Sequence, residues 1–144
     1  MDEYRGAGYQ LGITALYVLL CPVLLLNHEH GAALALIEQG LTTTSRNSER
    51  IFEAELCRLK ARTLNLRGAT AAGIELLQKA LATARSQHAK ALELRLATDL
   101  ATLRMEQGER QEALEILAPV YGRFTEGFET QDLKQAKGLL DQLR

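Results

Sequence analysis

Residues 54–121 repeat themselves with a period of about forty residues, and this repeat restricts the folds open to the chain. Each copy holds two helical hydrophobic patterns joined by a short turn. A period of this length built from two helices is typical of helical-hairpin solenoids, in which each unit buries its apolar face against the next. The equivalent positions include Ala61 and Ala101, Gly68 and Gly108, Gly73 and Ala113, and Leu77 and Leu117.

The spacing inside one copy explains why two helices would pair. Ala61 lies in the first helix, and Gly68 marks the turn. In the second helix Gly73, Leu77 and Ala80 lie at i, i+4 and i+7, so they share one stripe. Small residues let two helix backbones approach closely, and Leu77 fills the space between them. We therefore expect Leu77 to be buried.

The composition agrees with an all-α domain. The 144 residues have the length of one domain, aromatic residues make up 5%, and no alternating pattern suggests a sheet. A net charge of −1 provides no excess of positive charge with which to bind nucleic acid or an anionic membrane. Cys21 and Cys57 fall in apolar helical patterns, which indicates buried thiols in a reducing, cytoplasmic compartment.

The predicted domain covers residues 1–144 and consists of three helix pairs and a capping helix. We expect the segment 42–47 to form a polar loop and Asn47 or Ser48 to cap the following helix. Gly108 should end its helix as the residue after the cap, and Thr130 should cap the last helix. The predicted units are about 8–45, 49–86 and 89–121, and the capping helix is 130–143.

Residues 6–28 carry no charge, which raises the question of a membrane or export role. The strongly apolar part, residues 11–26, is shorter than the ~20 residues of a spanning helix, and the acidic start does not suit a signal peptide. We expect a buried first helix, kinked or locally broken at Pro22. Apolar residues surround this helix, so some should stay exposed, and a homodimer through residues 11–26 would cover them.

The repeat resembles the tetratricopeptide repeat in the offsets of its small and bulky residues. It departs from that pattern because it has no Trp, Ala replaces the usual Gly of the first helix, and no Pro follows Ala80. The segments DEYRGAGYQLG, AELCRLKARTLN and LAPVYGRFTEGFETQDLKQAKGLLDQL also resemble the C-terminal tail of bacterial regulatory ATPases fused to adenylate/guanylate cyclase or transcription-regulator domains. His28 replaces the usual turn glycine. The resemblance implies a non-catalytic region of a signalling protein.

No pattern in the sequence supports catalysis, a metal or a cofactor. The HEH sequence at residues 28–30 lacks the i, i+4 spacing of a helical metal site, so we interpret it as a solvated turn. The glycines match no phosphate-binding loop. No Ser or Cys has an evident His partner.

The predicted site is the polar face of the first helices, which lines the peptide-binding groove in tetratricopeptide solenoids. Arg58 and Arg62 are i, i+4, and clustered arginines can hold a carboxylate or an acidic peptide. The alternative is a salt-bridged exposed face, with Arg58 or Arg62 paired to Asp99 or Glu55. The residues at the positions that line the groove in tetratricopeptide repeats are Glu55, Arg58, Arg62, Asn65, Arg95, Thr98, Asp99, Thr102 and Glu106.

The leading hypothesis is a non-enzymatic module that binds a protein or peptide in signalling or regulation. The second is an assembly module that self-associates through its first helix. An enzyme of unrecognised type is a third alternative, and it would need a cleft with converging titratable groups.

Overall fold

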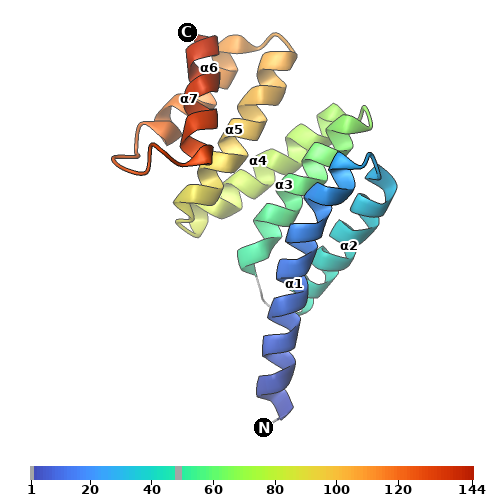
Figure 1. Ribbon diagram of the computed structural model, residues 1–144. Coiled ribbons are helices and arrows are strands. Elements are labelled where there is room, and N and C mark those ends of the chain that lie inside the picture. Colours follow the sequence, from blue (N-terminus) through green and yellow to red (C-terminus); the bar gives the residue numbers. More distant parts are fainter. Residues whose placement is uncertain (1, 48–49) are drawn as a thin grey trace. The chain divides into compact units, whose positions relative to one another are not determined.

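The computed structural model describes the backbone of residues 2–47 and 50–144 and the side chains of residues 14–44 and 52–144. Every regular element in these residues is a helix (Figure 1), which confirms the all-α prediction. The helices are α1 (Asp2–Leu26), α2 (His30–Asn47), α3 (Arg50–Leu66), α4 (Thr70–Ser86), α5 (Lys90–Glu106), α6 (Arg110–Tyr121) and α7 (Gln131–Leu143).

The chain divides into two compact units, Met1–Gly73 and Ile74–Arg144, with the boundary inside α4. In the first unit α1, α2 and α3 all contact one another. In the second unit α5, α6 and α7 do the same. Each unit therefore contains three mutually packed helices and buries its own apolar side chains.

Four helices end in the same left-handed turn. The second residue after the helix has a positive φ at His28 (60°), Gly68 (84°), His88 (54°) and Gly108 (84°). At each turn this residue and the next donate their N–H groups back to carbonyls of the last helical turn, for example Gly108 to Met105 at 2.9 Å. This is the Schellman arrangement. It confirms the expected role of Gly108 and places His28 where the repeat has a turn glycine.

The small residues of the repeat lie where backbones come close. A Cβ at Gly73 would lie 3.0 Å from the carbonyl oxygen of Ala61, and one at Gly40 would lie 3.0 Å from Cδ1 of Leu56. The equivalent residues Ala33 and Ala113 are fully buried. At the two glycines even a methyl group would press on its neighbour, and at the two alanines a larger side chain would push neighbouring helices apart. The bulky positions Ile37, Leu77 and Leu117 are buried too, as expected for Leu77.

The α7 helix takes the same place in its unit that α3 takes in the first. It packs on α5 and α6 as α3 packs on α1 and α2. A shift of two repeat lengths also brings buried positions of the two helices into register. These pairs are Leu56 and Ala136, Leu59 and Leu139, and Thr63 and Leu143.

The predicted loop at residues 42–47 is wrong, because α2 continues through it to Asn47. The hydroxyls of Thr42, Thr43 and Thr44 donate to backbone carbonyls three or four residues earlier at 2.9 Å. These side chains are therefore satisfied inside the helix and do not compete with it. Ser48, one of the two expected caps of α3, lies outside the described residues.

Two expectations about helix ends and interiors also need correction. Pro22 does not break α1, which runs as one helix from Asp2 to Leu26. Packing against α2 and α3 can hold a helix together when a single backbone hydrogen bond is lost. Thr130 does occupy the N-cap position of α7, but its hydroxyl donates to the carbonyl of Gly127 at 2.7 Å and caps no N–H group.

Two glycine-to-alanine changes in the second unit should have opposite effects on stability. No side chain or backbone crowds Gly108 or Gly138, so only backbone conformation matters. Gly108→Ala should lower the free energy of unfolding by about 1 kcal/mol, because a side chain disfavours the left-handed turn. Gly138→Ala lies inside α7 and should raise it by about 0.5–1 kcal/mol. Urea denaturation followed by circular dichroism measures both, and equal effects would contradict the left-handed turn.

Candidate functional site

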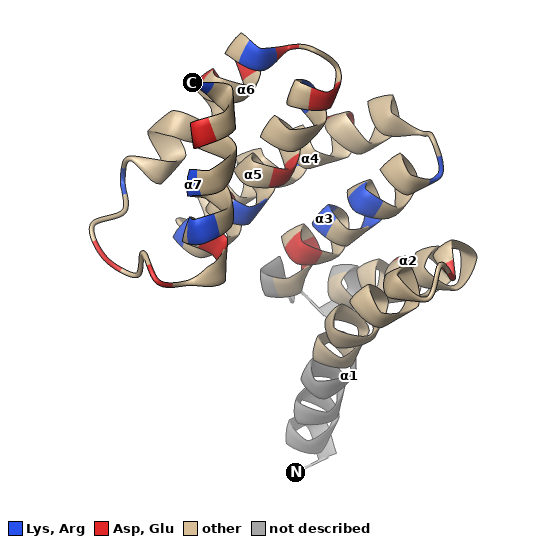
Figure 2. Ribbon diagram, turned by 45° about the horizontal axis from the view of Figure 1, so that its top comes forward, with Lys and Arg blue, Asp and Glu red and all other residues tan. Residues whose placement is uncertain are grey.

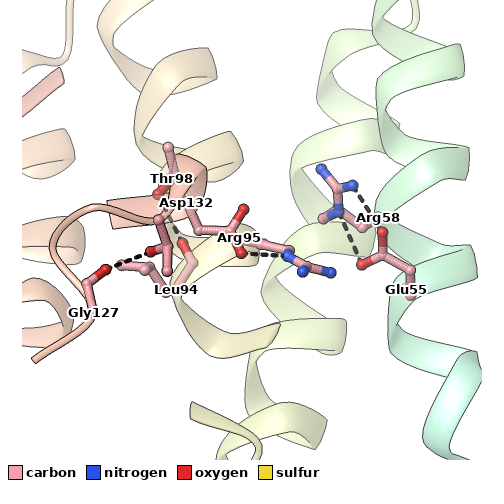
Figure 3. Close-up of polar contacts among 8 residues, drawn as sticks. Glu55, Arg58, Leu94, Arg95, Thr98, Gly127 and Asp132 are labelled. Carbon is pink, nitrogen blue, oxygen red and sulfur yellow. Dashed lines mark hydrogen bonds and ion pairs between the residues drawn. The ribbon is translucent and has the colours of Figure 1, made fainter. Parts of the chain in front are cut away.

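The polar face of α3 carries an internal ion pair. The guanidinium of Arg58 holds the carboxylate of Glu55 in two places, Nε to Oε2 at 3.1 Å and Nη2 to Oε1 at 2.8 Å (Figure 3). Both side chains are largely shielded from solvent, 14% and 13% exposed. This confirms the pairing of Arg58 with Glu55 that the sequence left as the alternative to peptide binding. Arg58 is therefore already engaged by a carboxylate of its own helix.

The two remaining candidates on α3 differ in their availability. Asn65 is half-buried, and its Oδ1 accepts a hydrogen bond from the Thr70 hydroxyl at 2.6 Å. Arg62 is exposed and has no ion-pair partner among residues 14–44 and 52–144. Of the predicted site residues on this helix, Arg62 is the one whose charged group faces solvent.

On α5 the first candidate, Arg95, is likewise paired. Its Nε donates to Oδ2 of Asp132 at 2.7 Å, which joins the helix to the first turn of α7 (Figure 3). The side chains of Arg95 and Asp132 are 43% and 30% exposed. Asp132 lies in the first turn of α7, where a carboxylate interacts favourably with the helix dipole, and it also neutralises Arg95.

Most of the other candidate side chains on α5 already interact with groups of the protein. The Thr98 hydroxyl donates to the carbonyl of Leu94 at 2.7 Å, and the Thr102 hydroxyl donates to that of Thr98 at 2.8 Å. Asp99 is half-buried and has interactions within the protein, and Glu106 is exposed. The two threonines therefore offer a ligand only acceptor lone pairs, because each hydroxyl proton is already donated.

The nine predicted site residues are shared between the two compact units. Glu55, Arg58, Arg62 and Asn65 belong to the first, and the five residues of α5 belong to the second. Within the units the structure brings Glu55 to Arg58 and Thr98 to Thr102.

A buried carboxylate that the sequence analysis missed lies in the first turn of α5. Glu93 is 3% exposed, and its Oε1 accepts from Nε of Arg85 at 2.9 Å and from Nη2 of Arg123. Burial by itself raises the pKa of Glu93, but the hydrogen bonds and charges of Arg85 and Arg123 outweigh it and hold the pKa below the usual range. The cluster joins the end of α4, the start of α5 and the segment after α6.

No signal in the sequence would have identified Glu93. An acidic residue in the first turn of a helix is usually exposed and interacts with the helix dipole. Arg123 is thirty residues further on and comes from a loop. Only the packing of α6 against α5 brings the three side chains together.

The thiols and histidines give no reactive or metal-binding cluster. Cys21 is buried and Cys57 is half-buried, and burial raises the pKa of both thiols, with Glu53 raising that of Cys57 further. A raised pKa leaves a thiol protonated and a poor nucleophile at neutral pH. His28 is exposed, and in the described part of the chain no three His, Cys, Asp or Glu side chains come together as metal ligands would.

Comparisons of the sequence with protein-family models and with curated proteins gave no match. The resemblance to tetratricopeptide repeats and to the tails of bacterial regulatory ATPases therefore rests on the motifs in the sequence. Among the residues that the structure describes, no helix has the length and apolar character needed to cross a membrane.

Removing the carboxylate of Glu93 should destabilise the protein in a pH-dependent way. Glu93→Gln should lower the free energy of unfolding by about 1–3 kcal/mol at pH 7. The loss is limited because Arg85 and Arg123 are about half-exposed and can be hydrated once released. A depressed folded pKa stabilises above the unfolded pKa of about 4.3, and the effect is lost as pH falls through the folded value.

The difference between Glu93→Gln and the unchanged protein should therefore shrink below pH 4. Thermal or urea unfolding at pH 7, 5 and 3.5 measures it. Glu115→Gln, an exposed change on α6, is the matched control and should have little effect. A difference that stays constant from pH 7 to pH 3.5 would contradict the charge cluster.

Proposed function

We propose that the chain is a non-catalytic interaction module that self-associates through α1. The observation that carries this proposal is a stripe of large apolar side chains exposed on that helix. We call it the α1 stripe, and its members with their exposed fractions are Leu16 (49%), Leu19 (69%), Leu20 (42%), Val23 (51%) and Leu26 (79%).

The spacing of the α1 stripe makes it one continuous surface. Leu16, Leu19, Val23 and Leu26 follow one another at intervals of three or four residues, and Leu20 is four residues after Leu16. All five therefore lie along one side of the helix. The opposite side packs into the first unit, where Cys21 is fully buried with Ile37 and Leu59. Monomeric proteins rarely expose a contiguous apolar surface of this kind unless it binds something.

A second copy of the chain is the occupant that the surface fits. Residues 6–28 carry no charge, and the described part of α1 shows none in Figure 2. Such a surface offers no charged group by which to select a polar partner, whereas an identical apolar stripe matches it in chemistry. Two copies related by a twofold axis would place the two stripes against each other, the usual geometry of homodimers.

A tetratricopeptide-like hairpin arrangement is the architecture we propose for this module. It is supported by the forty-residue spacing of the left-handed turns at His28, Gly68 and Gly108. The place of α7, which corresponds to that of α3, supports it as well. In such arrays the outer face of a helix pair is either polar or covered by a partner, and the described part of α1, residues 14–26, has an apolar outer face. The resemblance of the sequence to bacterial regulatory tails suggests signalling as the context.

The self-association proposal predicts a homodimer. Charged substitutions in the α1 stripe should convert this dimer to a monomer. The double change Leu19→Glu and Leu26→Glu would bury two carboxylates in an apolar contact, which is strongly unfavourable. Light scattering after size-exclusion chromatography at micromolar concentration measures the mass. Leu66→Glu, at an exposed leucine of α3 (55%), is the control and should leave the dimer intact.

A strictly monomeric unchanged protein would refute the proposal. A dimer that survives the double change would show that another surface associates. Circular dichroism of each variant must match that of the unchanged protein, so that a loss of dimer reports on the contact itself.

Binding of an acidic peptide is a second candidate function, favoured by the exposure of Arg62. Arg58 and Arg95 already hold Glu55 and Asp132, so Arg62 would provide the free guanidinium. Fluorescence anisotropy with a labelled hexaglutamate peptide tests this. Arg62→Glu should weaken binding about tenfold or more, while Arg67→Glu, an equally exposed charge reversal, should weaken it less. Equal effects of the two changes would indicate non-specific charge attraction and reject the candidate.

A further inference from the structure

A cavity of about 340 Å³ lies within the second unit. Its walls come from the first turn of α5, the loop between α6 and α7, and the first turn of α7. Cavities of this volume are at the small end of the range in which proteins bind small molecules. None of the residues predicted as a groove from the sequence lines it.

One part of the cavity wall is apolar. Leu94 and Leu133 are almost fully buried, 1% and 3% exposed, so they form a fixed surface. Ala91 and Phe124 extend this surface toward the opening, since Ala91 is exposed and Phe124 half-buried. A ligand could transfer a compact apolar group from water onto these side chains, and burial of apolar area is favourable.

The charged side chains of the cavity wall differ in whether an opposite charge neutralises them. Asp132 is neutralised by Arg95. Arg123 shares the single carboxylate of Glu93 with Arg85, so that cluster keeps one excess positive charge. Lys90 and Glu126 complete the charged lining, and neither has an ion-pair partner in the described part of the second unit.

Counted together, these groups give the cavity one net positive charge. The ammonium of Lys90 is exposed and free to turn toward a ligand. An anionic group would be attracted by this ammonium and by the excess charge of the Arg123 cluster, whereas a cation would be attracted only by Glu126.

We infer that this cavity binds a monocarboxylate with a compact apolar tail. The carboxylate pairs with Lys90, and the tail lies on Leu94, Phe124 and Leu133. This chemistry belongs both to the C-terminal residue of a peptide and to a free aliphatic acid. The inference is independent of the self-association of α1, because all residues of the cavity lie in the second unit.

The test compares three ligands that share one apolar chain and differ in charge. Isothermal titration calorimetry of the full chain uses octanoate, octanol and octylamine, each below the concentration at which it forms micelles or a separate phase. Octanoate should bind saturably and at least tenfold more tightly than either other ligand. Equal affinities for octanoate and octylamine, or no saturable binding of octanoate and of the peptide described below, would overturn the inference.

Two variants and one control locate the binding. Lys90→Gln removes an exposed charge without disturbing the core and should weaken octanoate binding about tenfold. Ala91→Phe should fill the cavity and weaken binding to a similar degree. Lys134→Gln, an exposed lysine of α7 outside the cavity, should change nothing. Unaltered binding by Lys90→Gln would overturn the inference, and circular dichroism checks that each variant is folded.

A last comparison separates the two sources of the carboxylate. A short peptide ending in leucine is titrated with its C-terminus either free or amidated. Tighter binding of the free-acid peptide than of octanoate assigns the cavity to peptide C-termini. Weaker binding of that peptide than of octanoate assigns it to small acids. If the amidated peptide binds as tightly as the free acid, the carboxylate has no role and the inference fails.

Discussion

The left-handed residue that follows each of α1, α3, α4 and α5 is the constraint on which the rest of the structure depends. At His28, Gly68, His88 and Gly108 the chain reverses within a few residues, and two backbone hydrogen bonds close each helix. Because α3, α4 and α5 each have 17 residues, these turns recur at regular intervals. Within each compact unit, reversal of the chain brings neighbouring helices side by side, so a simple pattern of small and large residues is enough to build a core.

A second set of contacts fixes the parts of the chain that the repeat does not specify. Glu93 draws the end of α4 and the segment after α6 to the start of α5 through Arg85 and Arg123. Arg110, at the start of α6, donates to the carbonyls of Gln142 and Leu143 and so closes the C-terminal end of α7. Both contacts join segments distant in sequence, and the first supports the wall of the cavity beside Lys90.

The polar faces of α3 and α5 and the apolar face of α1 differ in how far their side chains are already engaged within the protein. Many polar side chains on α3 and α5 already bind other groups of the protein, as Arg58 binds Glu55 and Arg95 binds Asp132. The exposed leucines of α1 have no such compensation. An internally paired arginine has to lose its partner before it can bind a new one. Exposed apolar surface has no such partner, and its burial against any matching apolar surface lowers the free energy. This difference is why self-association ranks above peptide binding here.

The sequence alone determined the helical class, the positions of most helix ends and the buried positions of the repeat. Hydrophobic periodicity and turn glycines are local signals, and they sufficed for Leu77, Gly108 and the exposed apolar helix. They failed at the segment 42–47, because threonine hydroxyls can bond within a helix, and they gave no sign that His88 adopts a left-handed conformation in the turn that follows residue 86. The charge partners and the cavity were decided by tertiary structure alone. Glu93 binds Arg123, and Lys90 and Phe124 line the same cavity, only because the packing of α5, α6 and α7 brings together residues about thirty positions apart. No local pattern in the sequence encodes that approach.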